Sequence, residues 1–126
     1  MEREREREAR EGDALIVRVA ERLRDEAPYR EAFATPEEAR MFRAAMERRF
    51  DPDTLQRLVQ GERATVAQVG GTRLDGLFLA RAYLDSQGEP EHSERRLSLM
   101  DAIVDVQVAA KRARHAHEED GHDWGL

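Results

Sequence analysis

The chain contains no cysteine, which excludes disulfide bonds, thiolate metal sites and cysteine nucleophiles. Glycine and proline are sparse, with eight and four residues among 126, and aromatic residues make up only 6%. No apolar run approaches the ~20 residues that span a bilayer, and the start of the chain is rich in Glu and Arg, unlike a signal peptide. We therefore expect a single, cytoplasmic domain.

A strong charge of one sign is also missing from the body of the chain. The net charge is −6, but residues 1–13 hold six acids and four arginines, and residues 115–126 hold four acids and no Lys or Arg. The remaining 17 acidic and 17 basic residues balance. A neutral body disfavours nonspecific binding to nucleic acid or to an anionic membrane, which needs a concentrated basic surface.

The residues that are abundant favour helix. Alanine accounts for 18 of the 50 hydrophobic residues, and it is the best helix former. Residues 93–119 contain no proline or glycine and begin at Ser93, a suitable N-cap. Their apolar positions recur at steps of three and four residues, at Leu97, Met100, Ile103, Val104, Val108 and Lys111. This stretch predicts a long helix that acts as the spine of a helical bundle.

The rest of the chain divides into shorter amphipathic segments. Thr35 and Asp51 each precede a proline, and Thr72 precedes another apolar segment, so all three are predicted N-caps. Residues 64–69 fit either a helix or a strand, and we favour helix because no second strand is available for pairing. The prediction is an all-α fold, a small bundle of five or six helices at 13–26, 36–50, 52–60, 64–69, 73–86 and 93–119. The last two form an antiparallel hairpin because their connection is short.

Three regions follow from this division. Residues 1–12 are a charged Glu/Arg arm, which is either a frayed helical extension or disordered. Residues 13–119 form the single helical domain, and residues 120–126 are an acidic tail that contains histidine.

Side chains that could support catalysis or metal binding do not form a recognisable site. His115, His117 and His122 lie among carboxylates, but the last two are five residues apart rather than four as in a His-Glu-x-x-His helix. We expect Gly121 to end the helix between them. Asp101 and Asp105 could act as an acid–base pair only if buried. We therefore predict no catalytic residue, no metal and no cofactor.

A helix-turn-helix is the alternative that a specific pattern favours. Residues 52–86 could form three successive helices with a tight Gly70-Gly71 turn. The arginines that could contact nucleic acid are Arg57, Arg63, Arg73 and Arg81. Asp75 would repel phosphate, and the apolar segment 77–80 is typical of a buried helix. An acidic inhibitor protein ranks lower still, because the acids lie at the ends of the chain.

The leading hypothesis is a non-enzymatic protein–protein interaction module, either a homo-oligomeric adaptor or a small regulatory subunit. The last two predicted helices have more apolar surface than a thin core requires, and such a surplus is typical of a surface for self-association or for another protein. Aromatic and methionine side chains are favoured at interface cores. The predicted interface residues are Phe78, Tyr83, Leu97 and Met100.

Overall fold

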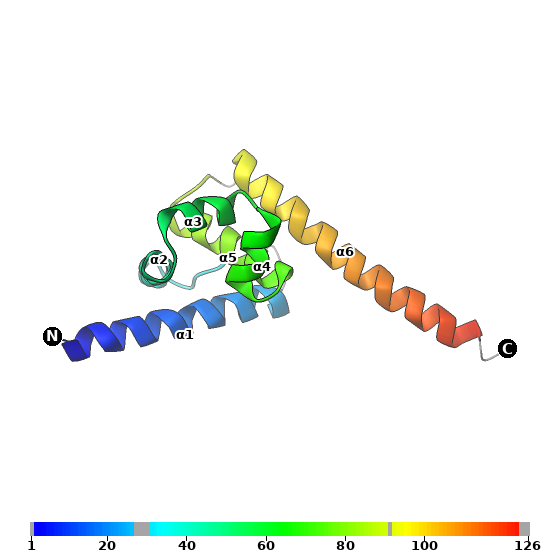
Figure 1. The fold of residues 1–126 in the computed structure, drawn as a ribbon, viewed down its shortest axis with the longest axis horizontal. Helices are drawn as coiled ribbons and strands as arrows, with labels where there is room; N and C mark the ends of the chain where they lie inside the picture. Colours follow the sequence, from blue (N-terminus) through cyan, green and yellow to red (C-terminus); the bar gives the residue numbers. More distant parts are fainter. Residues whose placement is uncertain (1, 27–30, 91, 124–126) are drawn as a thin grey trace.

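The computed structural model describes the backbone of residues 2–26, 31–90 and 92–123, and the side chains of residues 3–24, 31–90 and 92–114. In these ranges the chain forms six helices and no strand, which confirms the predicted all-α class (Figure 1). The helices are α1 (Glu2–Glu26), α2 (Pro36–Arg49), α3 (Pro52–Val59), α4 (Arg63–Gly70), α5 (Arg73–Ser86) and α6 (Glu94–Asp123).

The three predicted N-caps are present. The Thr35 hydroxyl accepts a hydrogen bond from the Glu38 N–H at 3.1 Å, and the Glu38 carboxylate accepts one from the Ala34 N–H at 3.1 Å. This reciprocal pair is a capping box whose return bond is displaced by one residue. Asp51 and Thr72 begin α3 and α5 in the same way, each accepting a backbone N–H from three residues further on. Local side-chain chemistry thus sets these helix starts.

Helix α5 lies at the centre of the fold. Nine consecutive residues, from Gly76 to Leu84, are buried, so the helix is covered on every side. Helices α1, α2, α3, α4 and α6 all pack against it. The prediction that the last helix is the spine is therefore wrong, although α5 and α6 do form the expected antiparallel hairpin. A helix that is apolar around its whole circumference occupies the interior, whereas α6 is apolar in separate stripes.

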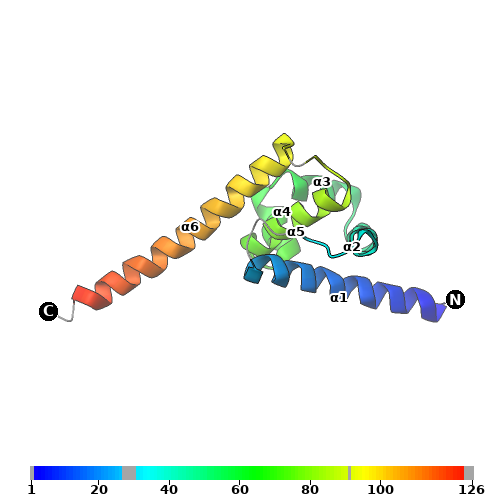
Figure 2. The same cartoon turned by 180° about the vertical axis from the view of Figure 1, so that it is seen from behind.

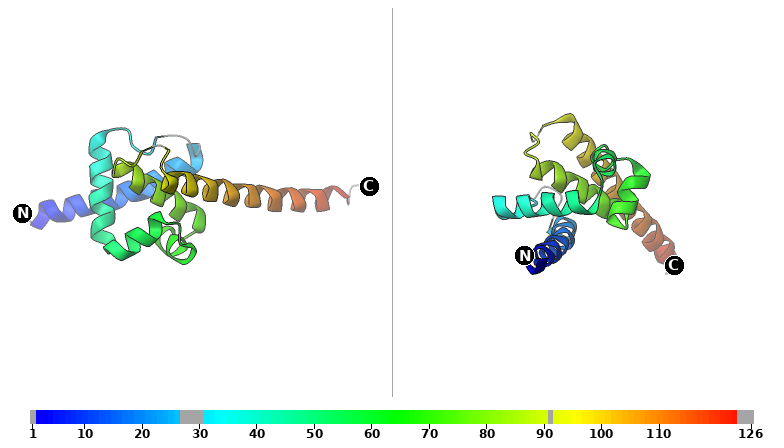
Figure 3. Two further views of the ribbon diagram at one scale, coloured as in Figure 1. Left: turned by 90° about the horizontal axis from the view of Figure 1, so that it is seen from above. Right: turned by 60° about the vertical axis from the view of Figure 1, so that its left-hand side comes forward.

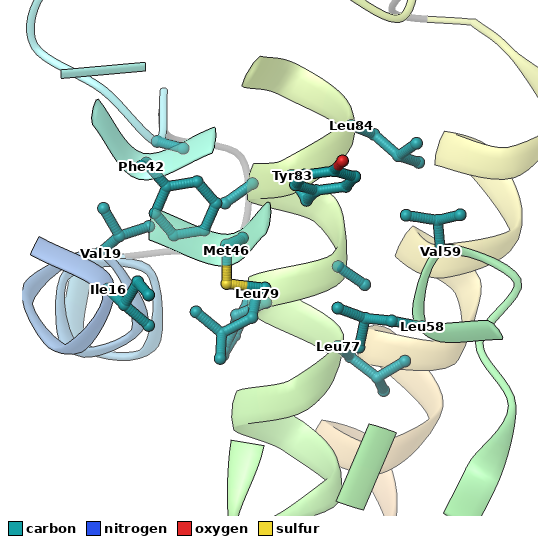
Figure 4. Packing of buried hydrophobic residues seen from close by; sticks show 14 of the residues in the cluster. Ile16, Val19, Phe42, Met46, Leu58, Val59, Leu77, Leu79, Tyr83 and Leu84 are labelled. Atoms are coloured by element: carbon teal, nitrogen blue, oxygen red, sulfur yellow. The ribbon is translucent and has the colours of Figure 1, made fainter. Parts of the chain in front are cut away.

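The core has two sides around α5 (Figure 4). On one side, Phe42 and Met46 of α2 lie between α5 and the apolar stripe of α1, which includes Ile16 and Val19. On the other side, α3 contributes Leu58. All five side chains are at most 4% exposed.

Backbone contact fixes the crossing of α4 and α5. Gly70 and Gly76 allow the two helices to meet without side chains between them, because a Cβ on Gly76 would lie 1.9 Å from the Val66 carbonyl oxygen. Gly71 ends α4 with φ of 78°, a left-handed conformation that glycine adopts readily. Residues 64–69 lie within α4 and are helical, as favoured.

The two end helices extend beyond this core in opposite directions (Figure 1 and, from behind, Figure 2). Residues 2–12, the predicted arm, are the first turns of α1, so the structure describes the helical extension. Helix α6 continues through Gly121 to Asp123, past the predicted end at 119. One glycine costs a helix only about 1 kcal/mol, which does not require a break. Among the described residues, no helix is both long and apolar enough to cross a membrane.

Candidate functional site

Helix α6 separates its apolar side chains into two faces. Leu99 and Ile103 are 2% and 0% exposed and pack in the core. Leu97, Val104 and Val108 are 48%, 37% and 41% exposed. The sequence grouped all these residues into one band, whereas the structure places the second group in solvent. Leu97, Val104 and Val108 therefore form the main exposed apolar surface of α6.

The exposed residues follow a regular spacing. Leu97, Asp101, Val104, Val108 and Lys111 are separated by four, three, four and three residues, and all five are exposed. At about 100° per residue they fall within about 80° of one another, roughly opposite Leu99 and Ile103. We call these five residues the α6 stripe. Asp101, Val104 and Val108 were not among the predicted interface residues. Their alternating spacing of four and three is a heptad signal, but the spacing alone does not show that this face of the helix is the exposed one.

The stripe extends beyond the part of α6 that the body covers. The first turns of α6 lie against α5, while the second half projects away from the other helices (Figure 3). All side chains from Val108 to Arg114 are exposed. A helix in water is stabilised mainly by packing of its apolar face, so a long segment of α6 that no other helix covers would be stabilised by packing against another protein.

The predicted interface residues do not share one surface. Phe78 is 0% exposed and Tyr83 is 5% exposed, because both belong to the central helix α5. Neither side chain belongs to an exposed apolar face. Met100 is partly buried against the core, and Leu97 is about half exposed at the start of the α6 stripe. Of the four, Leu97 is thus the residue best placed for contact with another protein.

The four arginines of the helix-turn-helix hypothesis are not presented together either. Arg81 is 5% exposed, and α5, which would have to enter the major groove, is the most buried helix. Arg57 is exposed but lies in ion-pair contact with carboxylates of Asp53 and Glu62. Arg63 is exposed and Arg73 is partly buried. Residues 52–86 do form three successive helices, but the third is enclosed by the other elements.

Arg81 instead belongs to a charged cluster at the junction of α5 and α6. Its Nε lies 4.0 Å from Asp85 Oδ2, and Arg96 Nη2 of α6 lies 2.5 Å from Asp85 Oδ1. Burial lowers the pKa of Arg81, while Asp85 raises it and Arg96 lowers it. The Glu89 carboxylate and the Glu31 side chain also line the adjoining cavity of about 300 Å³. Because carboxylates lie next to both guanidinium groups, this cluster holds the start of α6 against α5 and does not offer excess positive charge to a ligand.

A second cavity, of about 390 Å³, lies beside Tyr83. The Tyr83 hydroxyl donates a hydrogen bond to Glu47 Oε1 at 3.1 Å, and Arg43 Nε lies 3.1 Å from the same oxygen. Burial raises the pKa of Tyr83, with further increases from the hydrogen bond and the charge of Glu47. The hydroxyl is therefore a hydrogen-bond donor at neutral pH rather than a base or a nucleophile.

The remaining candidate residues are easily placed. Asp101 and Asp105 are both exposed on α6, where carboxylates have no shielded environment for acid–base chemistry. The side chains of His115, His117 and His122 lie outside the described residues. Among the side chains that are described, no group of three or more His, Asp or Glu residues is arranged to hold a metal ion.

Comparison of the chain with protein-family models, with curated proteins and with solved structures found no match.

Proposed function

We propose that this chain is a non-enzymatic protein–protein interaction module, either a homo-oligomeric adaptor or a small regulatory subunit. The observation that carries the proposal is the α6 stripe, in which Leu97, Val104 and Val108 remain 48%, 37% and 41% exposed after the core is complete. Transfer of such side chains from water to an interface is favourable by about 25 cal/mol per Å² of apolar area. The proposed binding surface is the α6 stripe in place of the α5 residues that the sequence suggested.

The projection of α6 supports the same proposal. The charged cluster of Arg81, Asp85 and Arg96 holds the beginning of α6 on α5. Beyond this attachment, the helix presents its apolar residues on a single, regular face rather than scattered over its surface. Single exposed apolar residues are ordinary on a protein surface, whereas an ordered row is typical of helix-to-helix recognition.

The test compares two valine substitutions of equal size and charge. Val104→Glu introduces a carboxylate into the α6 stripe, while Val17→Glu introduces one at a 53% exposed valine of α1. Native mass is measured by size exclusion with light scattering from about 1 to 500 µM, and proteins that co-purify with each variant from its source cells are identified. We expect assembly or a co-purifying protein to be lost with Val104→Glu and kept with Val17→Glu.

Circular dichroism of both variants confirms that they remain folded. The proposal is wrong if the wild-type chain is monomeric and has no co-purifying protein that distinguishes the two variants. It is also wrong if Val17→Glu reduces assembly as much as Val104→Glu does.

A further inference from the structure

We propose that the α6 stripe binds the same stripe of a second copy of this chain, as an antiparallel two-helix coiled coil centred on residue 106. This inference rests on the proposed function and names its partner. In this register Val104 of one copy faces Val108 of the other, and Asp101 faces Lys111. The paired positions are symmetric about residue 106, since 104 and 108 lie two residues from it and 101 and 111 lie five residues from it.

The spacing of the stripe matches that of a coiled coil. Alternating steps of four and three residues place side chains at the two core positions of a heptad, with Leu97, Val104 and Lys111 at one and Asp101 and Val108 at the other. In an antiparallel pair, each layer contains a residue at the first core position of one helix and a residue at the second core position of the other helix. Four valines from the two copies then fill two central layers, and an Asp–Lys layer closes each end of this apolar centre.

Charge selects the antiparallel orientation. A parallel, in-register pair would place Asp101 beside Asp101 and Lys111 beside Lys111, so both layers would hold like charges. The antiparallel register places opposite charges in both layers. Polar residues at core positions commonly fix the register and orientation of a coiled coil at some cost in stability. Lys111 is the only lysine in the chain, and it stands at one of these positions.

The placement of α6 leaves room for the second copy. The stripe lies roughly opposite Leu99 and Ile103, which hold α6 against the body. A second α6 on the stripe is therefore separated from the body by the first α6, and the two bodies lie on the outer sides of the pair. The projecting half of each α6 runs along the attached half of the other (compare Figure 3). This pairing covers the segment that the monomer leaves exposed.

The contact is short, and the association should be reversible. Residues 97–111 span about 21 Å of helix at about 1.5 Å per residue. With two valine layers at its centre, such a contact is at the small end of specific interfaces. We expect a dissociation constant of the order of micromolar, so the native mass should depend on concentration.

Charge exchange tests the register in the full-length chain. Asp101→Lys and Lys111→Asp each put like charges into both polar layers, while the double exchange restores opposite charges there. We expect each single change to weaken self-association about tenfold or more and the double exchange to return it to within about threefold of wild type. Arg114→Asp is the control, because Arg114 is also exposed but lies outside the α6 stripe.

Cross-linking tests the orientation separately. Because the chain has no cysteine, Asp101→Cys and Lys111→Cys each carry a single thiol. In the antiparallel register positions 101 and 111 face each other, while two copies of position 101 are about 15 Å apart along the helix. A disulfide needs Cα atoms within about 7 Å. Oxidised glutathione should therefore cross-link the mixture of the two variants and neither variant alone.

Different failures have different meanings. Cross-linking of each single variant alone, or a double exchange that does not restore assembly, overturns this register and leaves the proposed interaction function standing. Equal effects of Arg114→Asp and Lys111→Asp also overturn it. If the wild-type chain stays monomeric at every concentration, the proposal that the partner is a second copy is wrong. The proposed function is then decided by comparing the proteins that co-purify with the Val104→Glu and Val17→Glu variants.

Discussion

Replacing Gly76 with alanine tests the backbone contact between α4 and α5. On an exposed helix this change would stabilise the chain by about 1 kcal/mol, because alanine is the better helix former. Here the new Cβ would lie 1.9 Å from the Val66 carbonyl oxygen, and contacts below 3.0 Å essentially never occur. Helix α4 would therefore have to move away from α5 by about 1 Å or more. The steric clash thus predicts a lower free energy of unfolding for Gly76→Ala, whereas helix propensity predicts a higher one.

The expected loss of stability follows from the contacts between α4 and α5 that would open. Val66 is 0% exposed, and a gap of about 0.5–1 Å removes roughly a quarter to a half of the dispersion energy of each contact it opens. Overpacking of a rigid site costs typically about 1–3 kcal/mol and occasionally more. Because the clash is with backbone, we take the upper part of this range, about 2–3 kcal/mol; after subtraction of the gain of about 1 kcal/mol in helix propensity, we expect Gly76→Ala to lower the free energy of unfolding by about 1–2 kcal/mol.

Urea unfolding followed by circular dichroism at 222 nm measures this change. With a denaturant slope of about 1.5 kcal/mol per molar, the midpoint should fall by about 1 M. Gly12→Ala of α1 is the comparison variant, since its Cβ would lie 2.8 Å from the Ala45 Cβ and the Arg48 Nη2, and 3.7 Å from the nearest backbone atom, the Ala45 Cα. We expect that variant to lower the free energy of unfolding by less than Gly76→Ala does. A Gly76→Ala midpoint at or above that of wild type would refute the backbone contact.

Two further predictions concern buried polar groups. Asp85→Ala removes the carboxylate next to the buried Arg81 guanidinium, and we expect the free energy of unfolding in urea to fall by about 3 kcal/mol. Asp53→Ala, which removes an exposed carboxylate, should lower it by less than about 1 kcal/mol, and equal losses would contradict the role of burial. Tyr83→Phe removes the hydrogen bond to Glu47 and should cost about 1 kcal/mol at pH 8. Because burial raises the pKa of Tyr83, its contribution is complete below the unfolded pKa of about 10 and is lost as the pH rises through the higher folded pKa. The gap between wild type and Tyr83→Phe should therefore narrow at pH 11, and a constant gap would argue against this ionisation.

The starts of α2, α3 and α5 could be predicted because their causes are local. Thr35, Asp51 and Thr72 satisfy backbone N–H groups only three residues away, so the sequence alone contains the whole interaction. The same applies to Gly71, whose positive φ ends α4. These signals do not depend on how the helices later pack.

The centre of the bundle and the faces of α6 could not be predicted in the same way. A period of 3.6 shows which side chains share a side of a helix, but not which side has a neighbour. Leu97 and Leu99 are two residues apart and equally apolar, yet one is 48% exposed and the other 2%. Arg81 looked like a surface arginine because the sequence does not show that Arg96 of α6 reaches Asp85, the partner of Arg81 four residues further along α5.

The central position of α5 has a consequence for folding during synthesis. Helices α1 to α4 emerge from the ribosome first, but the element against which each of them packs is fifth in the chain. Their apolar faces stay incompletely covered until residues 73–86 have been made, apart from the contacts that these helices make with one another. The nascent chain is thus most open to aggregation or to chaperone binding just before α5 appears. Helix α6 follows α5 in the chain, so the core that holds its first turns can already exist when it is made.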